Sequence, residues 1–146
     1  MEFEIKRFNE LTVQELYNLL QLRAEVFVVE QNCVYQDVDG KDEKAIHVLG
    51  YFEGNLAAYT RIFDKGYYFD EASIGRVVTA PKYRSMKFGH DLMQVSIDAV
   101  AEFFEETAIT ISAQEYLKKF YEGHGFVQTS EMYLEDDIPH IQMKRS

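Results

Sequence analysis

The sequence predicts an α/β fold in one domain, with helices layered against a mixed sheet. Short runs rich in β-branched and aromatic residues alternate with amphipathic stretches, a pattern typical of strands and helices that share one core. A length of 146 residues suffices for one domain with a substantial core and is short for two. The composition is 47% hydrophobic, which favours a folded chain over disorder. Because no repeat, low-complexity tract or linker divides the sequence, residues 1–146 are expected to form a single domain.

The N-terminal half is expected to hold three strands and one helix. Glu2 to Phe8 alternates in polarity and predicts the first strand. Thr12-Val-Gln-Glu15 is a capping-box sequence that starts a helix running toward Phe27, because the Thr and Glu side chains can satisfy its free N–H groups. Ala45 to Glu53 and Leu56 to Phe63 predict the two strands of a hairpin, since a Glu-Gly-Asn turn separates them.

The segment Ser73–Glu105 predicts a strand, a basic turn and a long helix. Ile74, Val77 and Val78 are β-branched, which indicates a short buried strand. The strand is expected to end at Pro81, because proline has no N–H for a ladder. The turn Lys82–Gly89 carries three positive charges. From His90 onward apolar residues recur at helical spacing, with carboxylates and amides on the other face. An amphipathic helix is therefore expected there.

The C-terminal third is expected to complete the sheet. Ala108 to Ser112 predicts a strand, and Ala113 to Tyr121 a short helix that ends at Gly123-His-Gly125. Phe126 to Thr129 and Ile138 to Met143 predict the last strands. At least one parallel pair is expected around the long helix, because parallel neighbours need a crossover connection of that size.

The turn before His90 is a candidate anion site. The first N–H groups of a helix have no partner inside it, and the helix dipole adds partial positive charge there. Arg84 and Lys87 place full charges beside those donors. Phosphate or pyrophosphate is the expected ligand, although neither the P-loop sequence nor G-x-G-x-x-G occurs in the chain.

Arg84-Ser-Met-Lys-Phe-Gly89 resembles the Arg/Gln-x-x-Gly-x-Gly/Ala pyrophosphate loop of the GNAT N-acetyltransferases. The flanking segments Ile74–Val78 and Gly89–Met93 resemble the ElaA-type branch of that superfamily. Lys87 stands where the family usually has its first loop glycine. Two consequences are open: the side chain restricts the approach of a ligand to the backbone, or its ammonium group touches a phosphate.

The resemblance implies a GNAT fold, a mixed and mostly antiparallel sheet flanked by helices, with acetyl-CoA as cosubstrate. It places the pantetheine arm along Val77 and Val78, where a backbone N–H would hold the oxyanion that forms during acyl transfer. It places the pyrophosphate on Arg84, Ser85, Met86, Lys87, Phe88, Gly89 and His90.

A second stretch, Leu22–Asp39, resembles the ElaA-type segment Leu-Arg-x-x-Val-Phe-Val-Val-Glu-Gln, which borders the acceptor cleft in that fold. The resemblance makes Glu30 the first candidate for the base that deprotonates the acceptor amine. Asp37 and Asp39 are further candidates to bind or deprotonate that amine. The alternative is a solvated loop with Asx turns near Asp39.

A third match, Leu117–Phe126, resembles the short helix and Phe-Tyr-x-x-x-Gly-Phe element that closes the GNAT domain. By that resemblance Tyr121 acts as the general acid. The leaving thiolate has a conjugate acid with a pKa near ~8.5 and a phenol has one near ~10, so a phenol within hydrogen-bond reach can protonate the sulfur. The alternative is an aromatic packing residue with a satisfied hydroxyl.

The histidines and the single cysteine do not indicate metal or thiol chemistry. The four histidines have no metal-ligand spacing, so no metal is expected. Ile138-Pro-His-Ile141 matches the C-terminal segment of the ElaA-type branch, which places His140 at the cleft; a sheet-edge histidine with a structural hydrogen bond is the alternative. Cys33 has no partner for an internal disulfide and is expected to be inert.

The formal charge of −10 argues against a nucleic-acid partner and suits a cationic substrate. No apolar run reaches membrane-spanning length and no signal-peptide pattern opens the chain, so a cytoplasmic protein without membrane contact is expected. The oligomeric state stays open.

The expected function is transfer of an acetyl group from acetyl-CoA directly to a primary amine, either of a small molecule or of a peptide. The alternatives are a catalytically weak GNAT module that binds acyl-CoA or a partner, and a phosphate-binding regulatory domain.

Overall fold

The computed structural model describes all 146 residues. Its strands are β1 Glu2–Arg7, β2 Ile46–Phe52, β3 Asn55–Phe63, β4 Ala72–Thr79, β5 Ile109–Gln114, β6 Val127–Gln128, β7 Tyr133–Glu135 and β8 Ile138–Arg145. Its α-helices are α1 Val13–Arg23, α2 Gly89–Phe104 and α3 Lys118–Glu122. Each strand lies close to a run that the sequence predicts, apart from β7.

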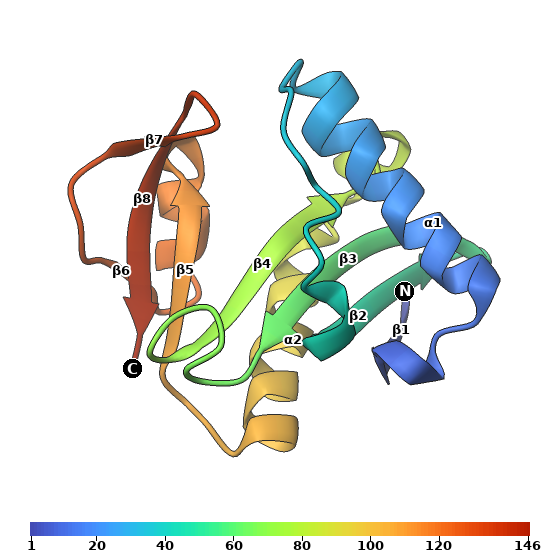
Figure 1. Ribbon diagram of the computed structural model, residues 1–146, viewed down its shortest axis with the longest axis horizontal. Helices are drawn as coiled ribbons and strands as arrows, with labels where there is room; N and C mark the ends of the chain where they lie inside the picture. The colour runs from blue at the N-terminus through green and yellow to red at the C-terminus, as the bar shows by residue number, and fades with distance from the viewer.

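The strands form one eight-stranded sheet in the order β1-β2-β3-β4-β5-β8-β6, with β7 paired to β8 (Figure 1). All pairs are antiparallel except β4 and β5, which α2 connects. The expected mixed, mostly antiparallel sheet flanked by helices is confirmed, and so is the parallel pair around the long helix. That pair has only two register partners, Ala72 with Ile109 and Ser73 with Thr110. Beyond them the two strands diverge, as Figure 1 shows.

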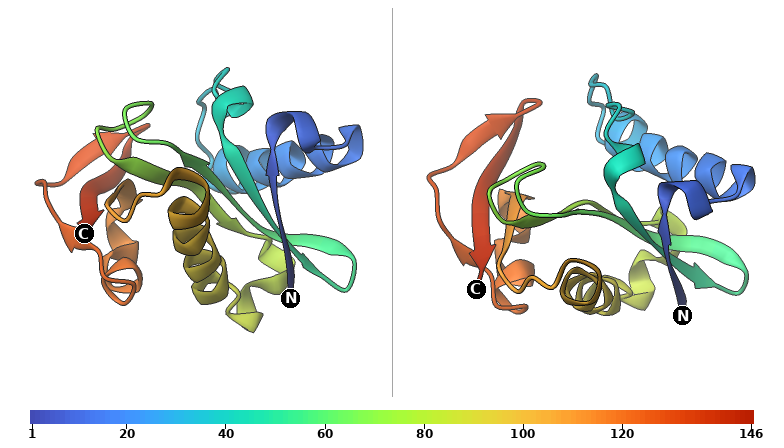
Figure 2. Two further views of the ribbon diagram at one scale, coloured as in Figure 1. Left: turned by 90° about the horizontal axis from the view of Figure 1, so that it is seen from below. Right: turned by 60° about the horizontal axis from the view of Figure 1, so that its bottom comes forward.

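Helices cover both faces of the sheet (Figure 2). On one face α2 packs Leu92, Met93 and Val100 into the larger apolar core, which also holds Tyr121 of α3. On the other face α1 contributes Leu19 to a second, smaller core. Alternation along β3 supplies both cores, because successive side chains of a strand point to opposite faces.

The first helix starts as predicted and continues in a different form. Thr12 Oγ1 accepts a hydrogen bond from Glu15 N at 3.1 Å, and Glu15 Oε1 accepts one from Thr12 N at 2.8 Å, so the capping box is confirmed. After Arg23 the chain continues as a π-helical segment, Ala24–Glu30. Apolar periodicity does not distinguish this wider turn from an α-helix, and such turns are frequent at functional sites.

The basic turn is a 3₁₀ helix, Pro81–Met86, followed by Lys87 in the left-handed region at φ 58° and ψ 39°. Phe88 then buries its ring against Phe52 and Tyr83 before α2 begins at Gly89. A left-handed residue explains the family's preference for glycine at this position, because a side chain disfavours that backbone conformation.

In the C-terminal third one expectation is wrong and one strand was missed. The helix expected from Ala113 begins later, because β5 extends to Gln114 and a 3₁₀ turn precedes α3. The strand β7 was not expected. It forms a tight hairpin with β8 through Asp136 and Asp137, both with positive φ, and aspartate tolerates that conformation well enough to make such a turn.

Candidate active site

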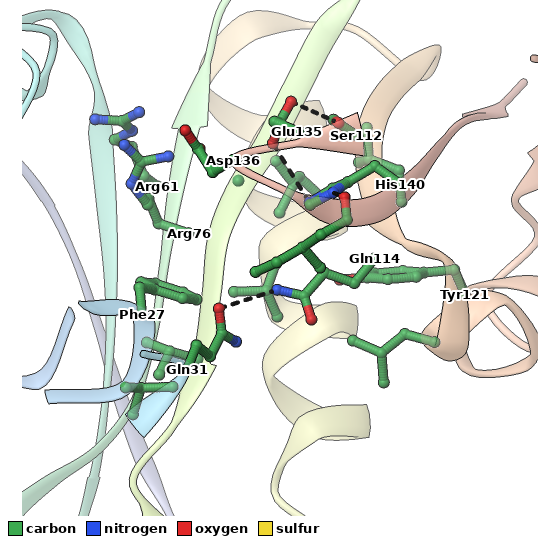
Figure 3. A pocket seen from close by; sticks show the side chains of 18 of the residues that line it. Phe27, Gln31, Arg61, Arg76, Ser112, Gln114, Tyr121, Glu135, Asp136 and His140 are labelled. Carbon is green, nitrogen blue, oxygen red and sulfur yellow. Dashed lines mark hydrogen bonds and ion pairs between the residues drawn. The ribbon is translucent and has the colours of Figure 1, made fainter. Parts of the chain in front are cut away.

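A cavity of about 540 Å³ lies where β4 and β5 diverge (Figure 3). Its walls come from these two strands, the π-helical segment, the basic turn, α3 and the β7–β8 hairpin. Six of the residues predicted to act in catalysis or CoA binding line it: Glu30, Val77, Val78, Arg84, Gly89 and Tyr121. The structure therefore brings together three sequence segments that the resemblance assigns to one site.

A β-bulge shapes the β4 wall. The register passes from Tyr59–Val78 to Arg61–Gly75, so Arg76 and Val77 face the single residue Thr60. Arg76 has a φ of 51°, in the left-handed region. A bulge leaves its extra residue without a ladder partner and bends the strand, which is common beside active sites.

The remaining residues of the basic turn do not line the cavity with their side chains. Ser85, Met86 and Lys87 are exposed, and the Phe88 ring belongs to the second core. The His90 ring lies 4.8 Å from that of Phe120, and its Nδ1 is 3.0 Å from Nε2 of His124. Burial and the neighbouring His90 lower the pKa of His124.

Arg84 and Glu30 form an ion pair at the end of the cavity next to α2. Arg84 Nη1 donates to Glu30 Oε2 at 2.8 Å, and Nη2 contacts the other carboxylate oxygen. The hydrogen bond from Arg84 lowers the pKa of Glu30. Glu30, the expected base, and Arg84, the expected pyrophosphate ligand, are therefore paired with each other in this structure.

Tyr121 lies in the cavity wall with its ring between two others. The ring centroid is 5.2 Å from that of Phe120 and 5.9 Å from that of Phe126. The side chain is buried, and burial raises the pKa of the phenol, followed by the effect of Tyr116. The hydroxyl is thus held in its protonated form, as a proton donor requires.

Asp37 and Asp39 do not line the cavity, contrary to their expected role as binders of the amine. With Asp42 they form a closed ring of ion pairs, here called the arginine–aspartate ring: Arg23, Arg61 and Arg76 with Asp37, Asp39 and Asp42. Each guanidinium contacts two of the carboxylates, and each carboxylate contacts two guanidiniums. Although burial opposes ionisation, hydrogen bonds from Arg61 bring the pKa of Asp39 to about 2. These aspartates are structural partners of the arginines.

The opposite wall carries polar groups from β5, β7 and β8, here called the β5–β8 wall: Ser112, Glu135 and His140. Ser112 Oγ donates to Glu135 Oε1 at 3.1 Å. The second carboxylate oxygen of Glu135 lies 3.4 Å from His140 Nε2, and His140 Nδ1 is 2.7 Å from the carbonyl oxygen of Ile138. His140 is therefore at the cleft, as the resemblance indicates.

Sequence analysis missed Ser112 and Glu135. The two residues are far apart in the sequence, and they meet only because β7 folds back on β8. The Asp136-Asp137 pair was the available signal, since two residues that tolerate positive φ between polar and apolar alternation are typical of a tight hairpin.

Cys33 lines the cavity and is a poor nucleophile. Burial, and then the charges of Asp136 and Asp137, raise the pKa of its thiol. The protonated thiol reacts slowly, because the thiolate is the reactive form.

A sheet that opens between two parallel strands, with a basic turn and a helix start at one end of the opening, defines an acetyltransferase domain of the GNAT type. The family model for the acetyltransferase (GNAT) domain matches residues 9–146. The chain belongs to this family.

The ElaA-type resemblance is confirmed by relatives that match over the full length. Protein ElaA of Escherichia coli is 40% identical over 147 residues, which is 99% of this chain and 96% of ElaA. The crystal structure of E. coli ElaA superposes with a TM-score of 0.92, covering 100% of both chains. A Pseudomonas aeruginosa structure described as an acyl-CoA N-acyltransferase is 43% identical, with a TM-score of 0.93 and 100% coverage of both chains.

None of the helices has the length and apolar character needed to cross a bilayer. No three or more His, Cys, Asp or Glu side chains gather in a way that could hold a metal ion.

Proposed function

We propose that the protein transfers an acetyl group from acetyl-CoA directly to a primary amine. The observation that carries this proposal is one continuous cavity lined by Arg84 of the basic turn, Gly89 at the start of α2, Val77 and Val78 of the bulged strand, and the neutral phenol of Tyr121. Family membership and the full-length likeness to an acyl-CoA N-acyltransferase support acetyl-CoA as the donor.

The pyrophosphate of CoA would bind at the first turn of α2. The free N–H groups there favour an anion, and Arg84 adds a full charge. Binding would exchange partners, because Arg84 would leave Glu30 for phosphate oxygens. The turn residues Ser85, Met86, Lys87, Phe88 and His90 would act through the backbone that they fix or, for Lys87, through an exposed ammonium group.

The transfer needs three groups of this chain. As the amine attacks the thioester carbonyl, a carbon–nitrogen bond forms, and a backbone N–H of the Val77–Val78 segment would hold the oxyanion. The carbon–sulfur bond then breaks and its electron pair goes to sulfur, which receives the proton of Tyr121. The proton that the new amide nitrogen loses restores the phenol. A separate base must first take a proton from the ammonium form of the acceptor, and Glu30 is the base that the resemblance proposes.

Incubation with acetyl-CoA and primary amines tests this function. We would use spermidine, phenethylamine and a short peptide with a free N-terminus, follow free thiol with a chromogenic disulfide, and identify the acetylated amine by mass spectrometry. Thiol release that depends on the amine is expected. Binding of CoA in a calorimeter without any transfer would favour the alternative of an acyl-CoA-binding module, and an absence of binding would exclude both.

A further inference from the structure

We propose that the β5–β8 wall is the acceptor-amine site and that His140 is the base that takes the amine's proton. This inference rests on the proposed function and names a residue for the step that Glu30 would otherwise perform. It is carried by the fixed tautomer of His140, the carboxylate beside its second nitrogen, and the position of both in the cavity wall.

The surroundings of His140 determine which nitrogen can accept a proton. Its Nδ1 lies 2.7 Å from the carbonyl oxygen of Ile138. Because a carbonyl oxygen only accepts hydrogen bonds, the neutral ring must carry its hydrogen on Nδ1. Nε2 then has a free lone pair. The ring of Tyr133 stacks on the imidazole with centroids 6.2 Å apart and helps to hold its orientation.

Glu135 and the free Nε2 of His140 together can bind a protonated amine. Its Oε2 lies 3.4 Å from Nε2, while its Oε1 is held by the hydroxyl of Ser112 at 3.1 Å. A lone pair and a carboxylate side by side do not bond to each other, but a protonated amine between them can donate to both. Once the proton has moved to Nε2, the carboxylate stabilises the imidazolium.

The position of the wall fits the direction of acyl transfer. Figure 3 shows His140 and Tyr121 on the same side of the cavity, with Phe27 and Gln31 opposite. Arg84, which pairs with Glu30, belongs to the basic turn, where the pyrophosphate is proposed to bind. Asp136 also lines the wall and adds a second negative charge for a cation. The chemical class of acceptor that this wall recognises is therefore a cationic primary amine.

The proton balance of the step is complete. One proton of the ammonium group passes to Nε2 of His140 and from there to solvent, which leaves the amine lone pair free to attack. The later protons move between the amide nitrogen, Tyr121 and the leaving sulfur as proposed above. No oxidant, metal or covalent enzyme intermediate enters the step.

The variant His140→Asn tests the inference. Asparagine has an amide N–H that can still donate to the Ile138 carbonyl, but it cannot take up a proton. We expect kcat to fall by about 100-fold or more, the loss that removal of a general base produces. The affinity for CoA and the midpoint of thermal unfolding should change little.

Glu135→Gln and Glu131→Gln form a matched pair. Both remove one carboxylate from the same part of the chain, but only Glu135 lines the cavity. Glu135→Gln should raise the KM for spermidine and lower kcat by about tenfold, since a charge-assisted contact to the substrate is lost. Glu131→Gln should retain both constants.

Each outcome decides between the two proposals. If the wild type transfers acetyl and His140→Asn stays within threefold of its kcat, the inference is overturned and the proposed function stands. If the wild type transfers acetyl to no amine, the proposed function fails, and ring-nitrogen NMR of the histidines decides the amine site. Spermidine should then shift the signals that are absent in His140→Asn, and unmoved signals would overturn the site.

Discussion

Two groups of charged side chains border the same cavity, and they differ in how completely their charges are matched. In the arginine–aspartate ring each of the six groups contacts two partners of opposite charge, and Arg23 is completely buried. In the β5–β8 wall, Glu135 is half exposed and His140 keeps a free lone pair beside it. A closed set of partners therefore fixes a structure, whereas an open set can receive a ligand.

The comparison also corrects an expectation based on residue type. Carboxylates near a cleft suggest amine binding, and Asp37 and Asp39 were candidates for that reason. Ion pairs with three arginines neutralise their negative charge, so it is not available to a substrate. Glu135 has no arginine in contact, and its charge can act on an incoming cation.

The largest expected effect is on stability and comes from opening the ring. Arg23→Ala leaves Asp37 and Asp42 with one guanidinium each, in a buried place, and should lower the free energy of unfolding by about 3 kcal/mol. Urea denaturation would measure the loss. Lys65→Ala, which breaks the surface pair with Glu106, is the control and should have little effect. Equal losses in the two variants would remove the distinction between the ring and an ordinary surface pair.

The next effect is on catalysis. Tyr121→Phe removes the proposed proton donor and leaves the ring packing with Phe120 and Phe126 in place. Turnover should fall by about 100-fold with little change in CoA affinity, because the hydroxyl acts on the leaving sulfur. Steady-state kinetics and calorimetry measure the two quantities. Unchanged turnover would contradict the general-acid role and indicate that Tyr121 is a packing residue.

A smaller effect is expected on cofactor affinity, where Arg84 and Glu30 compete with phosphate. Arg84→Ala should weaken CoA binding by about tenfold through the loss of a charge-assisted contact. Glu30→Gln should strengthen it by about threefold, since Arg84 is then free before the ligand arrives. Calorimetric titration of both variants tests the exchange of partners. Weaker binding in Glu30→Gln would contradict it.

Lys87→Gly separates the two consequences that the sequence left open. Glycine adopts the observed φ of 58° without strain, so the free energy of unfolding should rise by about 0.5–1 kcal/mol. If the ammonium group touches a phosphate, CoA affinity will fall in the same variant. If the side chain only restricts the approach of the ligand, affinity will rise.

The last expected effect concerns acid stability. The pKa of Asp39 in the folded protein is about 2, below its usual value of about 3.9. A depressed pKa contributes stability above about pH 4, and this contribution is lost as the pH falls toward 2. Asp39→Asn should therefore show a shallower decline of stability between these pH values. Identical slopes in urea denaturation would contradict the pairing with Arg61.

Most of the fold could be predicted from the sequence because its signals are local. The capping box at Thr12, the Glu-Gly-Asn hairpin turn and the helical periodicity after His90 each determine the structure of their own neighbourhood. The parallel pair followed from the length of its crossover. The π-helical segment could not be predicted, because its apolar pattern equally suits an α-helix.

The sequence predicted only those site residues that lie within a segment resembling the family. Arg84, Gly89, Val77 and Tyr121 line the cavity that the resemblance implies. The partners of a charged side chain depend on tertiary structure, and spacing along the chain does not reveal them. That is why the ring around Arg23 and the contact of Glu135 with His140 became visible only in the folded protein.

The roles of His140 and Glu30 are separated most directly by a single-turnover measurement of acetyl transfer to spermidine in enzyme already loaded with acetyl-CoA. Wild type, Glu30→Gln and His140→Asn would be compared at neutral pH, so that CoA binding no longer contributes to the rate. Transfer should be much slower in His140→Asn than in Glu30→Gln. A slower transfer in Glu30→Gln, with His140→Asn close to wild type, would contradict the role of His140 as the base.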